Sequence, residues 1–332
     1  MNMNNTIEKN YPFVSIIIPV RNVEKLIGQC LKSLEKLDYP KDRYEVIIAD
    51  SESDDRTEAI TRKYRAIFVS TPIRSICAGR NAGFEVAQGE IIAFSDVDCT
   101  MDKNWIRNSL KYFKDPAVGG VGGINLTPKE ESPFARAVGF VFDQPIFCAG
   151  SIYGRVLKQI KVVKSIPGCN AIYRRKALEG VLPMPETLSE DYIMNQKVRQ
   201  LGYKLLYTPD TIVWHYRRPL PWKFFKQMRH YAVCRLSIGK KDSKTINLVH
   251  IMVGFGLPVL TALSLFLIYL NPFWFLYFLL LITLFLTSYF LLAWLELKSI
   301  KAALFVPYAI TILFLAWSLG FLKELFSPKK IA

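Results

Sequence analysis

The C-terminal third of the chain contains three long runs without a charged residue, and these runs constrain the fold more than any other feature. They cover Ile251–Leu270, Pro272–Leu295 and Ala302–Leu322. Each has about 20 residues or more, which is long enough for a helix to cross the core of a bilayer. Buried core helices are the alternative, but these are usually shorter and have a polar face. We predict three transmembrane helices, at about 251–270, 272–295 and 302–322.

The start of the chain and the cysteines indicate the compartment. Residues Met1–Tyr11 are polar and lack the charged-then-apolar pattern of a secretory signal. The six cysteines are scattered and include no C-x-x-C pair. Such a distribution is typical of reduced cytosolic thiols and not of a disulfide framework or a zinc site. They are Cys30, Cys77, Cys99, Cys148, Cys169 and Cys234. We predict an integral protein of the cell membrane whose N-terminal domain lies in the cytosol.

A basic segment precedes the first apolar run in a chain whose formal net charge is +15. Between Arg217 and Lys244 basic residues alternate with apolar ones, and Asp242 is the single acid. Such a pattern is typical of a helix lying on anionic headgroups, and the neighbouring apolar runs favour lipid over nucleic acid. We predict that 217–248 binds anionic lipids. Three crossings would leave Lys329 and Lys330 outside, which conflicts with the positive-inside rule.

The first half of the chain alternates strand and helix patterns, which predicts a mostly parallel α/β sheet flanked by helices. The predicted strands are Phe13–Ile18, Tyr44–Ala49, Ala66–Val69, Ile91–Ser95, Val118–Ile124, Lys204–Tyr207 and Ile212–Trp214. The predicted helices are Glu24–Leu37, Asp54–Tyr64, Ile76–Ala87, Asn104–Phe113 and Tyr192–Leu201.

Polar side chains follow these strands. Asp96 and Asp98 end the run Ile91–Ser95, and Asp50 ends the second strand. Two Asp spaced i, i+2 point the same way, where they suit a hard divalent cation, although a polar turn is an alternative. Because ligands of such sheets bind beyond the carboxyl ends of the strands, we expect a binding site there.

In this order the segments resemble a family 2 glycosyltransferase with the GT-A fold, from about Pro12 to Arg235. The matching segments are Pro19-Val20-Arg21-Asn22, Ile47–Thr57 with Asp50, Ala78–Gly83, Asp96-Val97-Asp98 as the DXD motif, Ser189-Glu190-Asp191 and His215. The resemblance implies a nucleotide-sugar donor. The donor-binding residues that it implies are Pro19, Arg21, Asn22, Asp50, Ser51, Arg80, Asn81 and Asp96.

The resemblance also implies Mg²⁺ or Mn²⁺ held by Asp98, with Asp96 and His215 as further candidate ligands. Such an ion would neutralise the leaving diphosphate. A histidine hydrogen-bonded at a strand end is the alternative for His215. Asp191 is the expected general base for an inverting displacement, with Glu190 orienting it. The alternative for Asp191 is an acid that stabilises the first turn of a helix.

Membrane polysaccharide synthases related to this family carry Q-x-x-R-W before their membrane helices. Here Gln227-Met228-Arg229-His230-Tyr231 keeps only the glutamine, which weakens a processive reading. We expect Gln227, His230 and Tyr231 at an acceptor or membrane interface.

We predict three regions: 1–216 the glycosyltransferase domain, 217–248 the interfacial segment and 249–332 the transmembrane domain. The expected acceptor is a polyprenyl- or dolichyl-linked or membrane-presented saccharide. Three alternatives remain open: a processive polysaccharide synthase, a nucleotidyltransferase and a non-catalytic sugar-nucleotide-binding membrane protein.

Overall fold

The computed structural model describes residues 11–148, 151–152, 154–187 and 189–327, which form two compact units. Unit 1 consists of the described residues up to Leu126 together with Val156–His215, and unit 2 of Thr127–Arg155 and the described residues from Tyr216 onward. Two separate segments of the chain therefore belong to unit 2. The division predicted from the sequence does not separate the first of them, Thr127–Arg155, from the glycosyltransferase domain.

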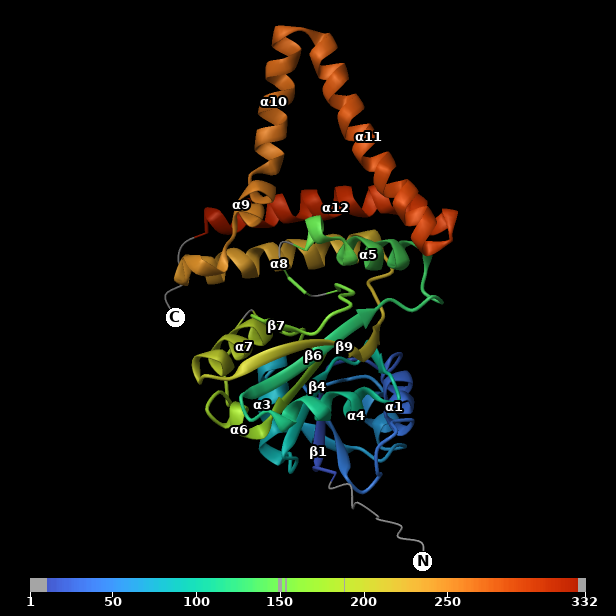
Figure 1. Cartoon of the computed structure of the whole chain (residues 1–332), viewed down its shortest axis with the longest axis vertical. Coiled ribbons are helices and arrows are strands. Elements are labelled where there is room, and N and C mark those ends of the chain that lie inside the picture. Colours follow the sequence, from blue (N-terminus) through green and yellow to red (C-terminus); the bar gives the residue numbers. More distant parts are fainter. Residues whose placement is uncertain (1–10, 149–150, 153, 188, 328–332) are drawn as a thin grey trace, which may run out of the picture. The chain divides into compact units, whose positions relative to one another are not determined.

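Unit 1 is built on a sheet of nine strands among the described residues, in the order β3-β2-β1-β4-β8-β6-β9-β5, with β7 paired to β9 (Figure 1). Its first half is parallel, as the alternating pattern predicts. This half comprises β1 (Val14–Val20), β2 (Tyr44–Asp50), β3 (Ile67–Ser70) and β4 (Ile91–Ser95). The central strands β1 and β4 are apolar except for Ser15 and Ser95 and are almost entirely buried, as expected for strands covered on both faces.

The second half of the sheet is mixed. It comprises β5 (Cys99–Met101), β6 (Val118–Leu126), β7 (Lys161–Val163), β8 (Asn170–Arg174) and β9 (Lys204–His215). Strand β8 runs antiparallel to both β4 and β6, and β5 and β7 run antiparallel to β9. The α/β class is confirmed, but the sheet is less parallel than predicted. The segments Lys204–Tyr207 and Ile212–Trp214 belong to one strand, whose register against β6 shifts between Gly123 and Ile124.

Helices flank this sheet. They are α1 (Ile27–Glu35), α2 (Thr57–Thr61), α3 (Ile76–Val86), α4 (Trp105–Leu110), η1 (Lys111–Lys114), α6 (Arg175–Glu179) and α7 (Glu190–Gln200). Helix α3 begins at the cap Ser75, whose Oγ accepts from the Ala78 N–H at 3.0 Å. A Cβ at Gly79 would lie 2.8 Å from Pro19 Cβ, and one at Gly83 would lie 2.4 Å from Ile17 Cγ2. The two glycines let α3 approach β1 closely.

Unit 2 is helical, with α5 (Pro133–Asp143), η2 (Pro145–Phe147), α8 (Pro221–Lys241), η3 (Ser243–Thr245), α9 (Leu248–Gly254), α10 (Gly256–Leu270), α11 (Pro272–Leu297) and α12 (Ile300–Leu325). Helix α12 lies alongside α8 and α5 (Figure 1). Their shared core includes Phe134, Phe224, Met228, Ala309 and Ile310. Aromatic rings pack edge to face within it, with the Phe134 and Phe224 centroids 6.0 Å apart.

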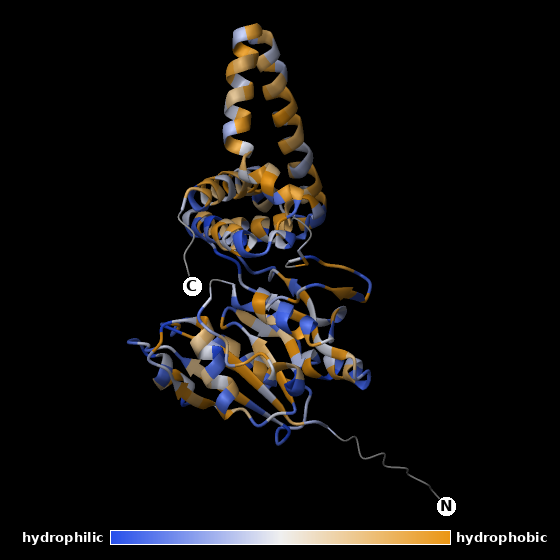
Figure 2. Cartoon of the chain, turned by 90° about the vertical axis from the view of Figure 1, so that its left-hand side faces the viewer, coloured by the Kyte–Doolittle hydropathy of each residue, from blue (hydrophilic) through white to orange (hydrophobic). Residues whose placement is uncertain are grey.

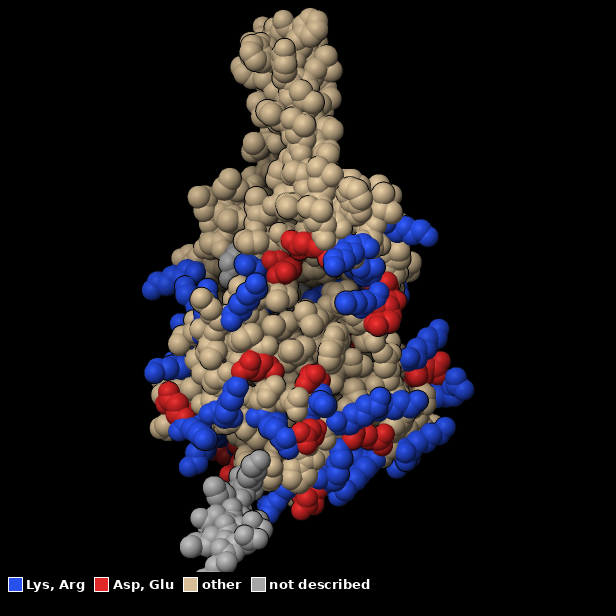
Figure 3. All heavy atoms as spheres, turned by 45° about the vertical axis from the view of Figure 1, so that its right-hand side comes forward, with Lys and Arg blue, Asp and Glu red and all other residues tan. Residues whose placement is uncertain are grey.

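Helices α10 and α11 form a hairpin that is mostly hydrophobic (Figure 2), and Glu296 near the end of α11 is its one charged residue. On the face seen in Figure 3, the upper part of this hairpin shows no acidic or basic side chain. By length and composition, α11 and α12 are each able to cross a membrane, with mean hydropathy of 2.3 and 2.0. Helices α9 and α10, bent by 56° at their junction, would make a third span if they act as one. Two to three apolar helices are thus present where three were predicted.

Candidate active site

The loops that follow β1 and β2 are tied together by hydrogen bonds. The Asn22 N–H donates to Ser53 Oγ at 2.7 Å, and Asn22 Oδ1 accepts from the Asp54 N–H at 3.0 Å. Asn22 and Glu52 have positive φ of 53° and 54°, in the left-handed region that Asn tolerates better than most residues. Of the predicted donor-binding residues, Asn22 therefore shapes the two loops.

Asp50 lies at the end of β2, opposite Val20 at the end of β1. It is 4 % exposed, and its carboxylate accepts from the Ser53 N–H at 2.9 Å and from Ser53 Oγ at 2.5 Å. The Ser51 N–H donates to the Val20 carbonyl at 2.9 Å. Arg21, in the same region, is exposed. These contacts hold the Asp50 carboxylate in one orientation at the sheet edge.

Arg80 is the largest charged side chain buried in unit 1. It is 1 % exposed, lies on α3, and its Cζ stands 5.2 Å from the centroid of the Phe94 ring. Its Nη1 lies 3.4 Å from Glu190 Oε1. Burial opposes the charged form, but Glu190, Asp96 and Asp191 together raise the pKa of Arg80 above its ordinary value. The guanidinium is therefore the cation around which these carboxylates gather.

Two nitrogens of this guanidinium, Nε and Nη1, donate no hydrogen bond to any residue that the structure describes. The guanidinium has little room on one side, since a Cβ at Gly168 would lie 2.5 Å from Arg80 Nη2 and 3.2 Å from Asp191 Cβ. Buried polar groups without a partner are uncommon in native proteins and call for an explanation. The Arg80 guanidinium is a planar fork of N–H donors, and two of its nitrogens have no hydrogen-bond acceptor among the described residues. Such a group suits an anionic ligand such as a phosphate.

Asp96 and Asp98 follow β4 directly, as predicted. Asp98 Oδ1 lies 3.3 Å from Nε2 of His215, a buried side chain at the end of β9. Burial raises the pKa of Asp96 to about 7, and Cys169 and Asp98 add to the rise while Arg80 and His215 oppose it. A pKa raised this far means that the positive charge around the Asp96 carboxylate is too small to stabilise its ionised form. The cluster of Asp96, Asp98 and His215 thus has the donors and the charge deficit that fit a divalent cation.

Glu190 and Asp191 occupy the first turn of α7, where acids also stabilise the helix dipole. Burial raises the pKa of Glu190; Arg80 opposes this rise and Asp191 adds to it. Asp191 Oδ1 accepts from the Tyr192 N–H at 2.7 Å. The structure therefore brings both acids of this predicted pair to Arg80, and through Arg80 to Asp96.

Other predicted residues lie elsewhere. The Asn81 side-chain amide donates to the Met184 carbonyl at 2.8 Å and accepts from the Met184 N–H at 2.9 Å, so it holds the chain before α7. Gln227, His230 and Tyr231 lie on α8 in unit 2. There Gln227 Nε2 donates to Tyr231 Oη at 3.3 Å.

Sequence reasoning missed three neighbours of the site. Phe94 lies against the Arg80 guanidinium, and Cys99 and Cys169 lie next to His215. Cys99 directly follows Asp98, but no spacing along the chain relates it to Cys169 or His215. Only the pairing of β5 with β9, and of β8 with β4, brings these three together.

Comparisons with known proteins identify the family. The family model described as "Glycosyl transferase family 2" matches residues 15–182. The glycosyltransferase AglE of Haloferax volcanii is 30% identical over 228 residues, 66% of this chain and 71% of that protein. A Methanococcus voltae enzyme named as a dolichyl N-acetyl-alpha-D-glucosaminyl phosphate 3-beta-D-2,3-diacetamido-2,3-dideoxy-beta-D-glucuronosyltransferase is 24% identical, over 67% of this chain and 73% of that protein.

The fold has a solved counterpart. The mannosyltransferase PcManGT from Pyrobaculum calidifontis, in complex with GDP-Man and Mn²⁺, superposes with a TM-score of 0.67 at 20% identity. The match covers 96% of this chain and 88% of that one. The likeness supports a GT-A fold. With a family match over more than half of the chain and a relative that is 30% identical, the chain belongs to glycosyl transferase family 2.

Proposed function

We propose that this glycosyltransferase is a membrane-anchored inverting enzyme. It moves a sugar from a nucleotide-sugar donor to a polyprenyl- or dolichyl-linked acceptor, or to a saccharide presented at the membrane. The observation that carries this proposal is the gathering of Asp96, Glu190 and Asp191 around the buried Arg80 guanidinium. Of the alternatives, the family match favours glycosyl transfer over nucleotidyl transfer.

Arg80 supplies the donor contact in this account. Its Nε and Nη1, which have no hydrogen-bond partner among the described residues, donate to the diphosphate of the sugar nucleotide. Asp50, fixed by Ser53, accepts from the base or ribose. Mg²⁺ or Mn²⁺ held by Asp98 and Asp96 would supply the positive charge that stabilises the departing diphosphate.

Asp191 is the base. A carboxylate in this position accepts the proton of the acceptor hydroxyl as that oxygen attacks the anomeric carbon. The bond to the diphosphate breaks from the opposite face, so one displacement inverts the anomeric configuration. Glu190 pairs with Arg80, and this ion pair holds Asp191 and the guanidinium in fixed positions relative to each other.

The acceptor follows from the exposed apolar surface of unit 2. Leu265, Phe273, Leu281 and Leu295 are between 64% and 71% exposed, on helices α10 and α11. Large exposed patches of this kind mark contact with a partner or a lipid phase. A chain held at the bilayer favours an acceptor carried by a lipid, and the name of the Methanococcus voltae relative points the same way. Gln227, His230 and Tyr231 are the residues of α8 that we assign to the acceptor side.

Within unit 2 we assign two membrane crossings, α9 with α10 and then α11, and place α12 in the membrane interface. Helix α8 is too rich in lysine and arginine to cross hydrocarbon. Helix α12 packs along it, because a Cβ at Gly320 would lie 2.4 Å from the Arg229 carbonyl and Lys240 Nζ lies 3.3 Å from Glu324 Oε1. Helices in contact over this length share one depth in the bilayer.

Two crossings also agree with the positive-inside rule, with which the three crossings predicted from the sequence conflict. They return Lys298, Lys301 and Lys323 to the side that holds the basic residues of α8, as the positive-inside rule requires. Lys329 and Lys330 lie outside the described residues. A C-terminal tag on the full chain should be cut by protease added on the cytosolic side only. Cleavage of the tag only by protease added on the opposite side would contradict two crossings and indicate three.

The donor site is tested by thermal unfolding of the full chain in detergent with a panel of sugar nucleotides, with and without Mn²⁺. One sugar nucleotide should raise the melting temperature, and more so with Mn²⁺. Asp98→Asn should lose the Mn²⁺-dependent part of the rise and keep the remainder. A panel without any stabilising sugar nucleotide would contradict both the proposal and the non-catalytic sugar-nucleotide-binding alternative, whereas stabilisation without any sugar transfer would favour that alternative.

A processive synthase is the remaining enzyme alternative. Product length separates it from the single transfer proposed here. One labelled sugar per acceptor in the presence of excess donor supports single transfer, whereas a ladder of longer products would establish processivity.

A further inference from the structure

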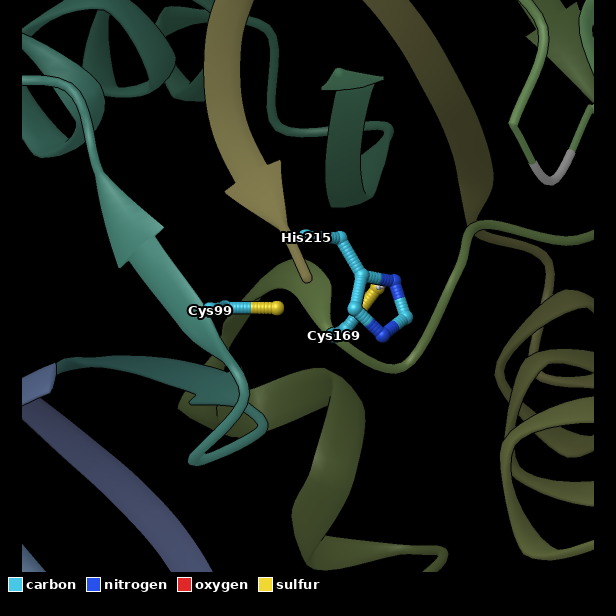
Figure 4. Close-up of side chains that lie close together, drawn as sticks. All are labelled: Cys99, Cys169 and His215. Carbon is cyan, nitrogen blue, oxygen red and sulfur yellow. Dashed lines mark hydrogen bonds between the residues drawn. The ribbon is translucent and has the colours of Figure 1, made fainter. Parts of the chain in front are cut away.

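Three side chains that commonly bind soft metals meet next to Asp98. Cys99, Cys169 and His215 point toward one another from β5, the segment before β8 and the end of β9 (Figure 4). Their ligand atoms all lie within 4.8 Å of one another. The three residues are 1 %, 2 % and 6 % exposed. They form one compact group that the proposed transfer chemistry does not use as a group.

The fold fixes each member of this group. Cys99 and His215 are direct partners in the antiparallel pair of β5 and β9, so their positions are set by backbone register. Cys169 is held because its carbonyl accepts from Ser95 Oγ at 2.8 Å, at the end of β4. A group positioned by three elements of one sheet is more preorganised than side chains that meet on a loop.

His215 uses its two ring nitrogens in different directions. Nδ1 lies 3.8 Å from Cys169 Sγ, and Nε2 lies 3.3 Å from Asp98 Oδ1. In metal sites a ligating histidine usually donates its second N–H to a carboxylate, which fixes the tautomer and the ring orientation. The Cys169–His215–Asp98 arrangement has this form, with Nδ1 toward the thiols and Nε2 toward the carboxylate.

We propose that Cys99, Cys169 and His215 form a binding site for a thiophilic divalent cation of the Zn²⁺ class. Tetrahedral zinc with Zn–S of about 2.3 Å and Zn–N of about 2.0 Å places neighbouring ligand atoms about 3.5 to 3.8 Å apart. The Sγ–Nδ1 distance of 3.8 Å is already in that range. Three protein ligands leave the fourth position to water. The absence of a C-x-x-C pair, which argued against zinc in the sequence, does not apply to ligands assembled by sheet register.

The chemistry of the thiols selects the ion. The ligands of zinc are thiolates, so binding releases one proton from each cysteine. Mg²⁺ and Mn²⁺ prefer oxygen donors, whereas Zn²⁺ gains enough from thiolate bonds to displace those protons.

This site has a consequence for the metal that serves transfer, which rests on the proposed function. When Nδ1 binds zinc, the ring proton lies on Nε2 and is donated to Asp98. Nε2 is then unable to ligate a second ion held by Asp98 and Asp96. Zinc therefore acts as an inhibitor that raises the Mn²⁺ concentration needed for transfer.

Binding is tested with Co²⁺ as the spectroscopic probe, on the full chain in detergent with a phosphine reductant. One equivalent of Co²⁺ should give thiolate-to-cobalt charge-transfer absorption in the near ultraviolet, which equimolar Zn²⁺ removes. Cys99→Ala and Cys169→Ala should each abolish the band. Cys77→Ala, which changes a thiol that is equally buried but lies on α3, should keep it. Co²⁺ binding to the unaltered chain without such a band would overturn the proposal.

A second measurement needs no variant and so does not depend on the folding of altered chains. X-ray absorption at the zinc edge of the zinc-loaded chain should show two sulfur ligands and one imidazole. A first shell of only oxygen and nitrogen would place zinc on the carboxylates and refute the thiol site.

The inhibitory role is measured separately. In the unaltered chain, one equivalent of Zn²⁺ should raise the Mn²⁺ concentration for half-maximal transfer by about tenfold or more, the scale on which neighbouring groups change metal affinity. Cys169→Ala should not show this increase. If the cobalt band appears and no transfer occurs at all, the metal site stands and the proposed function fails. If the band appears and zinc leaves the Mn²⁺ requirement unchanged, the inhibitory role is refuted.

Discussion

The two units of this protein depart from the usual placement of side chains in opposite ways. In unit 1 Arg80 is 1 % exposed and gathers acids around it, whereas in unit 2 Leu281 is 65% exposed. Burying a guanidinium carries a desolvation penalty even when acids pair with it, and large apolar patches are rarely left in water. Each departure is costly for a free domain in water. The comparison supports our proposals that unit 1 binds a charged ligand and that unit 2 contacts lipid.

A second contrast lies within unit 2. Helices α11 and α12 have 26 residues each and mean hydropathy of 2.3 and 2.0, but the most apolar window of α11 is 0% buried and that of α12 is 50% buried. The two helices have similar mean hydropathy although α11 is exposed and α12 packs against the basic helix α8. Hydropathy along the chain therefore does not distinguish these two kinds of helix. The four predictions that follow test these contrasts.

Asp191→Asn should give the largest effect, confined to unit 1. Removing a general base lowers kcat by about 10²- to 10⁴-fold. The dissociation constant of the donor, measured by calorimetry, should change less than about twofold, because the base acts on the acceptor hydroxyl. Glu58→Gln is the control, since Glu58 is also an acid in the first turn of a helix. Normal turnover by Asp191→Asn would remove Asp191 from its assigned role.

Arg80→Ala should destabilise the folded chain. Losing one member of a buried ion pair costs about 3 to 5 kcal/mol, because the remaining charge stays buried. Chemical unfolding of the full chain measures the change. The control is Arg62→Ala, which breaks the exposed Arg62–Glu58 pair at a cost of about 0.5 kcal/mol or less. Similar losses from both variants would show that the charge cluster around Arg80 is not a buried network.

Arginine placed in the middle of α11 or of α12 distinguishes the two helices. Thr283 and Thr311 are matched, since both are exposed and each donates to the carbonyl four residues earlier at 2.9 Å. Thr283→Arg should reduce membrane insertion by about 3 kcal/mol, the cost of arginine at the centre of a span. Thr311→Arg should cost less than about 1 kcal/mol, because an interfacial helix keeps its charges near water. Equal costs in an insertion assay would make α12 a third span.

Gly320→Ala tests the contact between α12 and α8. The added Cβ would lie 2.4 Å from the Arg229 carbonyl, a backbone atom that moves only with its helix. Overpacking of this kind costs about 1 to 3 kcal/mol. In Gly28→Ala, the control on α1, the new Cβ would meet its nearest neighbour at 3.6 Å. That variant should be neutral or stabilising by up to about 1 kcal/mol. An unchanged melting temperature for Gly320→Ala would contradict close packing of these helices.

Local sequence patterns predicted the parallel half of the sheet because its strands are continuous apolar runs. Ile91–Ser95 and the predicted strand Tyr44–Ala49 agree with β4 and β2 to within one residue. In the mixed half, β6 and parts of β9 were predicted as strands, but β5, β7 and β8 were not. Strand β5 has only three residues and pairs with a strand more than a hundred residues later. Periodicity reports which face of a segment is buried, but not which strand it pairs with.

The same limit applies to the site. Asp96 and Asp98 were predicted as site residues because they follow a buried strand, and Asp191 because Ser189-Glu190-Asp191 resembles a segment of the family. The Arg80–Glu190 ion pair and the cysteine–histidine group depend on contacts between distant segments. No spacing along the chain encodes them.

The site around Arg80 is proposed to transfer sugar to a lipid-borne acceptor. Membranes that contain the full chain are incubated with the radiolabelled sugar nucleotide found in the binding screen, acceptor lipid extract and Mn²⁺. We expect label in the organic phase, abolished by chelation of the metal and by Asp191→Asn. Label that remains entirely in the aqueous phase, as free sugar or as a soluble product, would contradict it.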